Sequence, residues 1–375
     1  MSSLSDDASV VQRIFDHIDH KTTDLSEASW REPVEHYRSG ERLAAELGVL
    51  RRTPTPFCPS AVLPKAGDYV ARAAAGTPLL AVRGTDGQVR VFRNACRHRG
   101  TQLASGSGCE KAFVCRYHGW TYGLDGRLRH VPHEHGFPGL DKDGRGLVPV
   151  ESVERHGMVF VTQQKSRSQD VELDRLPALI APDHQPVGSS EREVPANWKI
   201  LVEGFLEGYH IRSTHPATFF PVQFDNLNVV ETFGRNNRVV FPFRAINKLR
   251  AVPPAERSAD GKLTYVYHLF PNVMLATFPG RMFVVVLEPL AVDRTLMVTS
   301  VMTNRAMSGD EGRAASKRGA DLVAAGGAED REVACAIQRS LASGANEFFE
   351  FGRFEGAIAH FHRALHAALD SSPTA

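Results

Sequence analysis

The hydrophobic residues near the N-terminus recur at the spacing of a single helix face. The residues that follow this pattern are Val10, Val11, Ile14, Phe15 and Ile18. A second helical stretch is predicted over residues 33–47, ending near Gly48, and Pro54 then interrupts the periodicity. Residues 1–55 are therefore predicted to form N-terminal helices.

Short β-like runs alternate with glycine-rich turns over the next hundred residues. The runs lie at residues 68–72, 79–83, 89–93, 113–116 and 158–162. Asp86-Gly87 and Asp125-Gly126 are hairpin signals between them. Residues 56–165 are therefore predicted to form a small all-β domain.

The polar residues 163–169 mark a boundary, and helices and long strands are expected beyond it. Residues 197–212 are predicted to form a helix that Asn197 caps. Strands are predicted at residues 238–243, 264–270, 282–287 and 296–303. Gly326 and Gly327 are expected to break the chain before a last helical region over residues 330–369. Residues 166–375 are thus assigned to a second domain, and the fold class is α+β.

Length and composition are those of a globular protein with more than one domain. The chain has 375 residues, of which 42% are hydrophobic and 23% charged. The formal net charge of +1 provides no global attraction to nucleic acid or to an anionic membrane, so neither is expected as a partner. The first residues are acidic where a signal peptide needs positive charge, and no hydrophobic run is long enough to span a bilayer. A cytoplasmic location is expected.

Two of the five cysteines lie next to histidines. An odd number of cysteines without a signal sequence argues against a disulfide framework. Cys96 and His98 form one pair, and Cys115 and His118 form the other. A Rieske [2Fe–2S] cluster needs two thiolates on one iron and two imidazoles on the other, and these two pairs meet that need. A Cys2His2 zinc site is the alternative, although zinc fingers usually pair Cys with Cys and His with His.

A second set of candidate ligands follows in residues 203–216. On one helix, Glu203, Glu207 and His210 would share a face, at positions i, i+4 and i+7. His215 precedes a proline, which disfavours helix at that residue, so His215 is expected just past the helix end. Two histidines and one carboxylate are the ligands of Fe(II) oxygenases that leave positions open for O2. The candidates for the carboxylate are Asp330, Asp321, Glu329 and Glu332.

The sequence resembles a known family. Cys-Arg-His-Arg-Gly from Cys96, followed by Cys-Arg-Tyr-His-Gly-Trp-Thr-Tyr from Cys115, resembles the Rieske domain of ring-hydroxylating and related oxygenases over most of residues 60–165. The resemblance implies a catalytic helix-grip domain with a curved antiparallel sheet, on which residues 1–55 pack. It also implies that Asp330, at the start of the last helix, is the third ligand of a mononuclear Fe(II) beside His210 and His215.

The resemblance further implies an electron path between subunits. In the family, an acidic residue three positions before the first histidine ligand bridges to a Rieske histidine of the neighbouring subunit of a head-to-tail homotrimer. Glu207 stands at that position here. Most relatives have Asp there, whereas some oxygenases of quaternary amines have Glu. The expected partners are a reductase, with or without a ferredoxin, that passes on electrons from NAD(P)H.

The expected function is therefore that of a Rieske oxygenase, which hydroxylates a small organic, aromatic substrate with O2 by monooxygenation, dioxygenation or oxidative demethylation. An oxygenase of betaine-like or carnitine-like quaternary amines is one alternative. A Rieske electron-transfer protein or a zinc-binding protein without oxygenase activity is another. The candidate pocket residues are Phe205, Leu206, Phe219, Phe220, Met274, Phe278 and Phe283. His362 and His366 have a spacing that can bind metal but are interpreted as part of a surface or interface helix.

Overall fold

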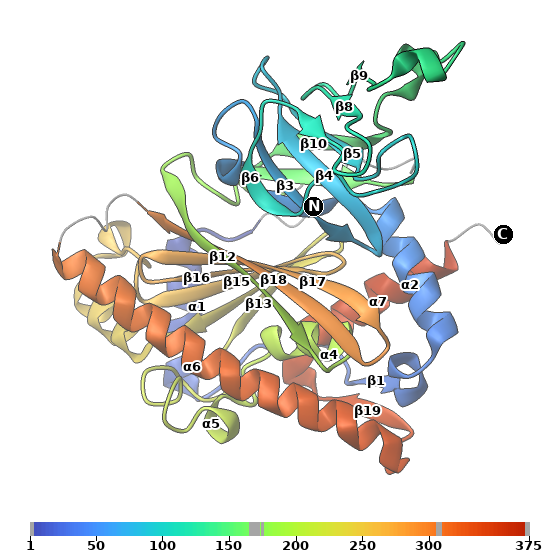
Figure 1. Ribbon diagram of the computed structural model, residues 1–375. Coiled ribbons are helices and arrows are strands. Elements are labelled where there is room, and N and C mark those ends of the chain that lie inside the picture. The colour runs from blue at the N-terminus through green and yellow to red at the C-terminus, as the bar shows by residue number, and fades with distance from the viewer. Residues whose placement is uncertain (1–3, 165–172, 174–175, 305–309, 372–375) are drawn as a thin grey trace. The chain divides into compact units, whose positions relative to one another are not determined.

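The computed structural model describes residues 4–164, 173, 176–304 and 310–371 (Figure 1). The chain divides into two compact units. The β unit comprises Arg51–Pro182, and the large unit comprises Met1–Leu50 with Asp183–Ala375. The predicted α+β class is confirmed. Among the described residues, no helix has both the length and the apolar character needed to cross a membrane.

The β unit is built on an antiparallel sheet of seven strands in the order β2-β11-β10-β5-β4-β3-β6. Its strands are β2 (Thr55–Pro59), β3 (Asp68–Ala74), β4 (Thr77–Arg83), β5 (Val89–Arg93), β6 (Gly106–Cys109), β10 (Pro149–Arg155) and β11 (Met158–Thr162). A three-stranded sheet of β7 (Phe113–Val114), β8 (Thr121–Tyr122) and β9 (Leu128–His130) lies in the same unit. Four of the five predicted runs are strands throughout, because their apolar residues fill the core beneath the sheets, and the run at residues 113–116 is a strand only over Phe113–Val114.

The large unit contains a second antiparallel sheet of seven strands, in the order β12-β18-β17-β16-β15-β14-β13. These strands are β12 (His184–Val194), β13 (Val229–Phe233), β14 (Asn236–Pro242), β15 (Leu263–Leu269), β16 (Val273–Phe278), β17 (Arg281–Ala291) and β18 (Arg294–Asn304). Strand β1 (Trp30–Pro33) pairs separately with β19 (Phe348–Phe351), which joins the two ends of the chain.

Helices pack on the sheet of the large unit, and α-helices of the described residues have the following bounds. They are α1 (Asp7–His20), α2 (Gly40–Arg52), α4 (Trp198–Phe205), α5 (Ile211–Thr214), α6 (Asp310–Ser340) and α7 (Gly356–Asp370). In Figure 1, α6 runs across one face of the sheet, and α4 contacts both α6 and β17. On β14, Val239 and Phe241 enter the core that includes α4, whereas Val240 enters the core that includes α1. The two faces of the sheet are therefore covered by different helices.

The helix predicted over residues 33–47 begins later than expected. Residues 30–33 form β1, and Val34–Tyr37 form a single 3-10 turn before α2. The reason is long-range, because the backbone of β1 pairs with β19, more than 300 residues away in the chain. Local periodicity contains no information about that partner.

The helix predicted over residues 197–212 is interrupted. Asn197 caps α4 as predicted, since its side chain accepts a hydrogen bond from the backbone N–H of Lys199 at 3.0 Å. The helix ends at Phe205, and the Glu207 carboxylate then accepts hydrogen bonds from the backbone N–H groups of Tyr209 and His210. A side chain that bonds to its own backbone in this way competes with helix continuation.

The predicted break at Gly326 and Gly327 is wrong, since α6 continues through both residues to Ser340. Gly326 serves packing instead. A Cβ atom at Gly326 would lie 2.2 Å from Cε2 of Phe219. Glycine at this position lets the Phe219 ring lie directly against the helix backbone. Asp330 consequently lies within α6 and not at the start of a helix.

Candidate metal centres

Two loops of the β unit present the predicted cluster ligands in the same way. The backbone N–H of Gly100 donates to the carbonyl of Cys96 at 2.9 Å, and that of Gly119 donates to the carbonyl of Cys115 at 2.9 Å. Both glycines have positive φ, +82° and +74°, which closes each loop tightly at little steric cost. The two loops therefore share the same backbone geometry, and each carries one cysteine and one histidine.

The thiols and imidazoles of these loops differ in exposure. Cys96 and Cys115 are buried, whereas His98 is half-buried and His118 is exposed. The two imidazole rings lie 4.7 Å apart between centroids, and Trp120 stacks on His98 at 5.0 Å. Partial burial, followed by the charges of His118 and Arg99, lowers the pKa of His98, which favours the neutral imidazole that metal ligation requires.

The donor set of these loops fits a two-iron cluster. Each loop offers one thiolate and one imidazole, and a Rieske [2Fe–2S] centre takes two thiolates on one iron and two imidazoles on the other. Zinc fingers, by contrast, usually pair Cys with Cys and His with His.

The predicted mononuclear ligands converge in the large unit. Ligand atoms of His210, His215 and Asp330 lie within 4.8 Å of one another. Oδ1 of Asp330 is 2.9 Å from Nε2 of His215 and 3.5 Å from Nε2 of His210. Nε2 of His215 is buried and makes no hydrogen bond within the described structure, although the carboxylate is so near. A buried lone pair directed at a carboxylate in this way fits a cation held between them.

Neighbouring carboxylates hold both histidines by their other ring nitrogen. Glu207 contacts Nδ1 of His210, and Glu329 lies 2.7 Å from Nδ1 of His215. Thr218 donates to the same Glu329 oxygen at 2.6 Å. Such contacts orient metal-ligating imidazoles. Glu329 therefore belongs to the surroundings of the site and not to the converging triad.

The remaining acidic candidates lie elsewhere. Asp321 and Glu332 are exposed and belong to no ligand group among the described residues. Glu203, predicted to share a helix face with Glu207 and His210, instead accepts a hydrogen bond from the Tyr37 hydroxyl at 2.6 Å and lies 2.9 Å from Nε2 of His362. The interruption after α4 separates Glu203 from the triad.

The triad has the electrostatics of a cation site. Burial alone would lower the pKa of His210, but hydrogen bonding to Asp330 and then to Glu207 raises that pKa to about 10. Burial would raise the pKa of Asp330, yet the two histidines hold it below its usual value. The carboxylates thus stabilise positive charge at this point, whether it is carried by protons or by a ferrous ion.

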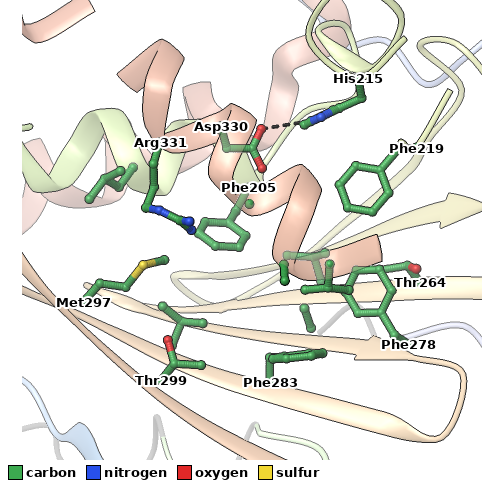
Figure 2. Close-up of a pocket in the computed structure, with 18 of the residues that line it drawn as sticks. Phe205, His215, Phe219, Thr264, Phe278, Phe283, Met297, Thr299, Asp330 and Arg331 are labelled. Atoms are coloured by element: carbon green, nitrogen blue, oxygen red, sulfur yellow. Dashed lines mark ion pairs between the residues drawn. The ribbon is translucent and has the colours of Figure 1, made fainter. Parts of the chain in front are cut away.

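A cavity of about 430 Å³ adjoins the triad, a size suited to a small organic molecule (Figure 2). It lies between α4, α6 and the sheet. Phe205, Phe219, Phe278 and Phe283 line it, as predicted. The predicted Leu206 and Met274 are fully buried core residues, and Phe220 lies beneath the guanidinium groups of Arg212 and Arg244.

Two arginines of this cavity were not among the predicted site residues. Arg192 of β12 and Arg331 of α6 both line it. Burial and the positive charge of Arg192 lower the pKa of Arg331. The only sequence signal was the position of Arg331 beside Asp330, and adjacent residues on a helix normally point about 100° apart. In Figure 2 the Arg331 side chain extends toward Phe205 and Met297, away from His215.

Comparison with protein families agrees with these two centres. Residues 53–150 match the Rieske [2Fe-2S] domain, and residues 181–371 match the ring hydroxylating alpha subunit (catalytic domain). The carnitine monooxygenase oxygenase subunit of Escherichia coli (strain K12) is 30% identical over 367 residues, which cover 90% of this chain and 93% of that protein. The chloroplastic choline monooxygenase of Beta vulgaris is 25% identical, with 77% of this chain and 66% of that protein covered.

Solved structures share the fold at lower identity. A quaternary ammonium Rieske monooxygenase in complex with L-carnitine matches with a TM-score of 0.75 and 22% identity, covering 98% of this chain and 99% of that one. Naphthalene 1,2-dioxygenase from Rhodococcus sp. matches with a TM-score of 0.76 and 18% identity, covering 98% and 99%. With its Rieske domain and its ring-hydroxylating catalytic domain, this chain belongs to the alpha subunits of the Rieske non-heme iron oxygenases, which are oxidoreductases that incorporate O2.

Proposed function

We propose that this oxygenase hydroxylates a carbon bonded to the quaternary nitrogen of a small molecule that also carries an anionic group. Relatives named for carnitine, glycine betaine and choline support a quaternary amine. The sequence-based expectation of an aromatic substrate lacks this support, and the quaternary-amine alternative replaces it.

The aromatic wall of the cavity suits a quaternary ammonium group. Phe219 contacts the His215 ring at 4.8 Å between centroids, and Phe278 links Phe219 to Phe283 at 6.3 and 5.8 Å. The face of an aromatic ring attracts an alkylammonium ion and needs no hydrogen-bond donor from it. An N-methyl group held against Phe219 would lie beside the metal ligands.

The observation that carries the proposal is the pair of arginines in the same cavity. Neither Arg192 nor Arg331 forms an ion pair or hydrogen bond with any residue in the described part of the chain. Burial first, and then the repulsion between these two like charges facing one cavity, lower the pKa of Arg331. A carboxylate or a comparable anion on the substrate would relieve this repulsion and accept bidentate hydrogen bonds.

The chemistry balances with O2 as the oxidant. Hydroxylation of a carbon next to the ammonium nitrogen consumes O2, two electrons and two protons, and releases water. The C–N bond then breaks, its electron pair stays on nitrogen, and the hydroxyl proton is lost, so the products are a carbonyl compound and a tertiary amine. A ferrous ion held by His210, His215 and Asp330 would supply O2 activation, with electrons stored in the cluster.

The electron supply requires partners. We propose a reductase, with or without a ferredoxin, that draws electrons from NAD(P)H and reduces the cluster at Cys96, His98, Cys115 and His118. We also propose a homotrimer in which Glu207 bridges to a Rieske histidine of the neighbouring subunit. Glu207 supports this role by contacting Nδ1 of His210 within its own chain.

A substrate comparison tests the proposal. L-Carnitine and glycine betaine carry both an ammonium and a carboxylate, whereas choline carries the ammonium alone. With a competent reductase, we expect O2 uptake coupled to tertiary amine or formaldehyde for the zwitterions. Arg331→Met should raise KM for them by roughly 10-fold or more, the effect of about 1.5–3 kcal/mol for one charge-assisted hydrogen bond, and leave any turnover of choline unchanged. An equal loss on both substrate types would contradict recognition of an anion by Arg331.

A further inference from the structure

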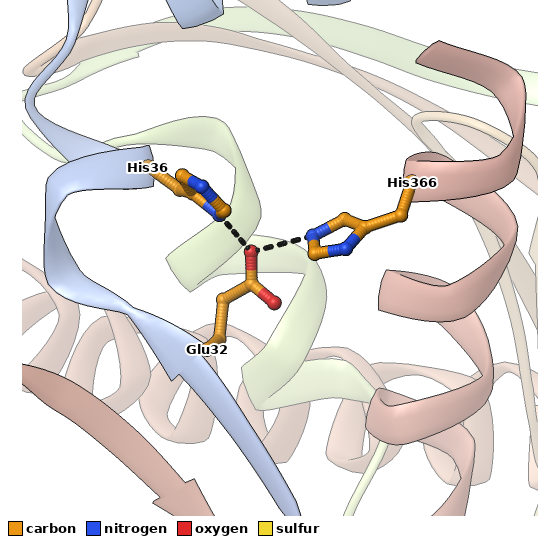
Figure 3. A group of neighbouring side chains, drawn as sticks. All are labelled: Glu32, His36 and His366. Carbon is orange, nitrogen blue, oxygen red and sulfur yellow. Dashed lines mark hydrogen bonds and ion pairs between the residues drawn. The ribbon is translucent and has the colours of Figure 1, made fainter. Parts of the chain in front are cut away.

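A second group of metal-ligating side chains lies where the two ends of the chain meet. Glu32 is on β1, His36 is in the following 3-10 turn, and His366 is on α7 (Figure 3). Each of these residues offers one ligand atom, and the three atoms lie within 4.8 Å of one another. This group is separate from the residues that line the iron cavity.

Glu32 is a buried carboxylate between two imidazoles. Its side chain is fully buried, and Oε1 is 2.6 Å from His36 and 2.9 Å from His366. In the described part of the chain, no lysine or arginine pairs with it. A buried carboxylate needs compensating positive charge. Here that charge comes either from protons on the histidines or from a cation.

His362 provides an independent observation. It is fully buried on α7, and its Nε2 lies 2.9 Å from the Glu203 carboxylate, so the neutral ring carries its proton on Nε2. Its Nδ1 consequently bears a lone pair. That atom lies 3.5 Å from Oε2 of Glu32 and forms no hydrogen bond with the described residues. A buried lone pair that faces a carboxylate oxygen is unfavourable unless positive charge lies nearby.

The carboxylate itself is held in place. The indole N–H of Trp30 donates to Oε2 of Glu32 at 3.0 Å, which leaves Oε1 directed at the two histidines. His36 and His366 remain about one-quarter to one-third exposed, so an ion can reach them from solvent. These side chains are therefore positioned to bind a metal ion that takes both imidazole nitrogen and carboxylate oxygen as ligands.

We propose that Glu32, His36 and His366 bind a divalent transition-metal ion of the zinc class, distinct from both iron centres. Two imidazoles and one carboxylate match the ligands that zinc prefers, and one position stays open to water. The negative charge of Glu32 and the lone pair of His362 would both face this ion. Because β1 and α7 come from opposite ends of the sequence, the ion would fasten the N-terminal segment to the last helix.

Zinc itself is the probe. Iron-loaded holoenzyme is equilibrated with Zn(II) at graded free concentrations, and its zinc and iron contents are measured together by mass spectrometry. We expect about one zinc per chain with the iron content unchanged. We also expect zinc to raise the midpoint of thermal unfolding, because the assembled donors of the folded chain bind it more tightly than the unfolded chain does.

Matched histidine variants localise the site. His36→Gln and His366→Gln should each weaken zinc binding by more than the 10–100-fold typical of residues around a ligand. His360→Gln alters a half-buried histidine of the same helix outside the cluster and should leave binding unchanged. Wild-type protein that retains its iron and takes up no zinc would overturn the proposal, as would zinc uptake that both cluster variants preserve. In that case protonated histidines alone compensate Glu32.

Discussion

Neighbouring residues on one helix turn perform different tasks at the mononuclear site. Asp330 faces Nε2 of both histidines, whereas Glu329 holds Nδ1 of His215. Both acids are ionised below their usual pKa, although burial alone would raise each value. The two carboxylates are thus not interchangeable as ligands, despite lying next to each other in the sequence.

Replacing Glu329 tests this division of roles. Glu329→Ala should weaken Fe(II) binding by about 10–100-fold, because His215 loses the partner that orients its ring. Glu329→Gln keeps an acceptor oxygen and should have a smaller effect. Glu332→Ala removes an exposed neighbour and should not change affinity. Iron retained against graded chelator measures all three, and equal retention by Glu329→Ala and wild-type protein would refute the role.

The site residues were predictable from the sequence to different degrees. The spacing of His210, His215 and Pro216 suffices to suggest a pair of ligands at a helix end. Asp330 follows only from family resemblance, since more than 100 residues and six of the seven strands of the sheet lie between it and the histidines. Arg192 could not be identified, because its position in the cavity depends on how β12 pairs with β18.

At the scale of elements, the continuity of α6 determines how the site is built. Two adjacent glycines normally weaken a helix, and the sequence therefore suggested a break. Gly326 is instead where Phe219 approaches the helix, and Phe219 in turn packs on the ligand His215. Tertiary packing outweighs local propensity here, because the glycine leaves room for a ring that belongs to the substrate cavity.

Two glycines of the same helix provide a matched test. Gly326→Ala places a Cβ atom 2.2 Å from the Phe219 ring and should destabilise the fold by about 1–3 kcal/mol, the usual cost of overpacking. In Gly319→Ala the nearest atom is the Pro279 carbonyl oxygen at 3.7 Å. That change should stabilise by roughly 0.5–1 kcal/mol through helix propensity. Urea unfolding measures both, and shifts of the same sign would contradict the packing argument.

At the scale of the whole molecule, the sheet of the large unit contains a buried histidine whose hydrogen-bond partners fit only the neutral ring. His268 on β15 is fully buried, with Nε2 2.9 Å from the Pro271 carbonyl and Nδ1 3.2 Å from the Asn237 amide. Burial lowers the pKa of His268 to about 4. The unfolded chain, with a histidine pKa near 6.5, therefore binds a proton more readily than the folded chain.

This difference predicts how stability depends on pH. Because the pKa of His268 is depressed on folding, its destabilising effect is absent above about pH 6.5 and grows as the pH falls toward 4. Between pH 7 and pH 5 the loss attributable to this group is about 2 kcal/mol. His268→Gln should have a shallower decline in urea midpoint over this range than wild-type protein. Parallel declines would show that His268 is not the group responsible.

The strands of the β unit could be predicted from the sequence, because the alternation of apolar residues and the turn signals depend only on nearby residues. The pairing of β1 with β19 is not local, and it is this pairing that buries Glu32 beside α7. The sequence alone places His362 and His366 on a surface or interface helix, whereas His362 is fully buried and both histidines contact Glu32. The pairing of β1 with β19 is therefore the feature that could not be predicted from the periodicity of the sequence.

Mössbauer spectroscopy of 57Fe-loaded protein tests most directly whether one chain holds two different iron centres. The dithionite-reduced wild-type protein should contain both a reduced [2Fe–2S] component and a separate mononuclear high-spin ferrous component. His215→Ala should lose the ferrous component and keep the cluster component, because the cysteine-bearing loops belong to the other unit. A wild-type spectrum without a cluster component, or a ferrous component that survives in His215→Ala, would contradict the assignment of these centres.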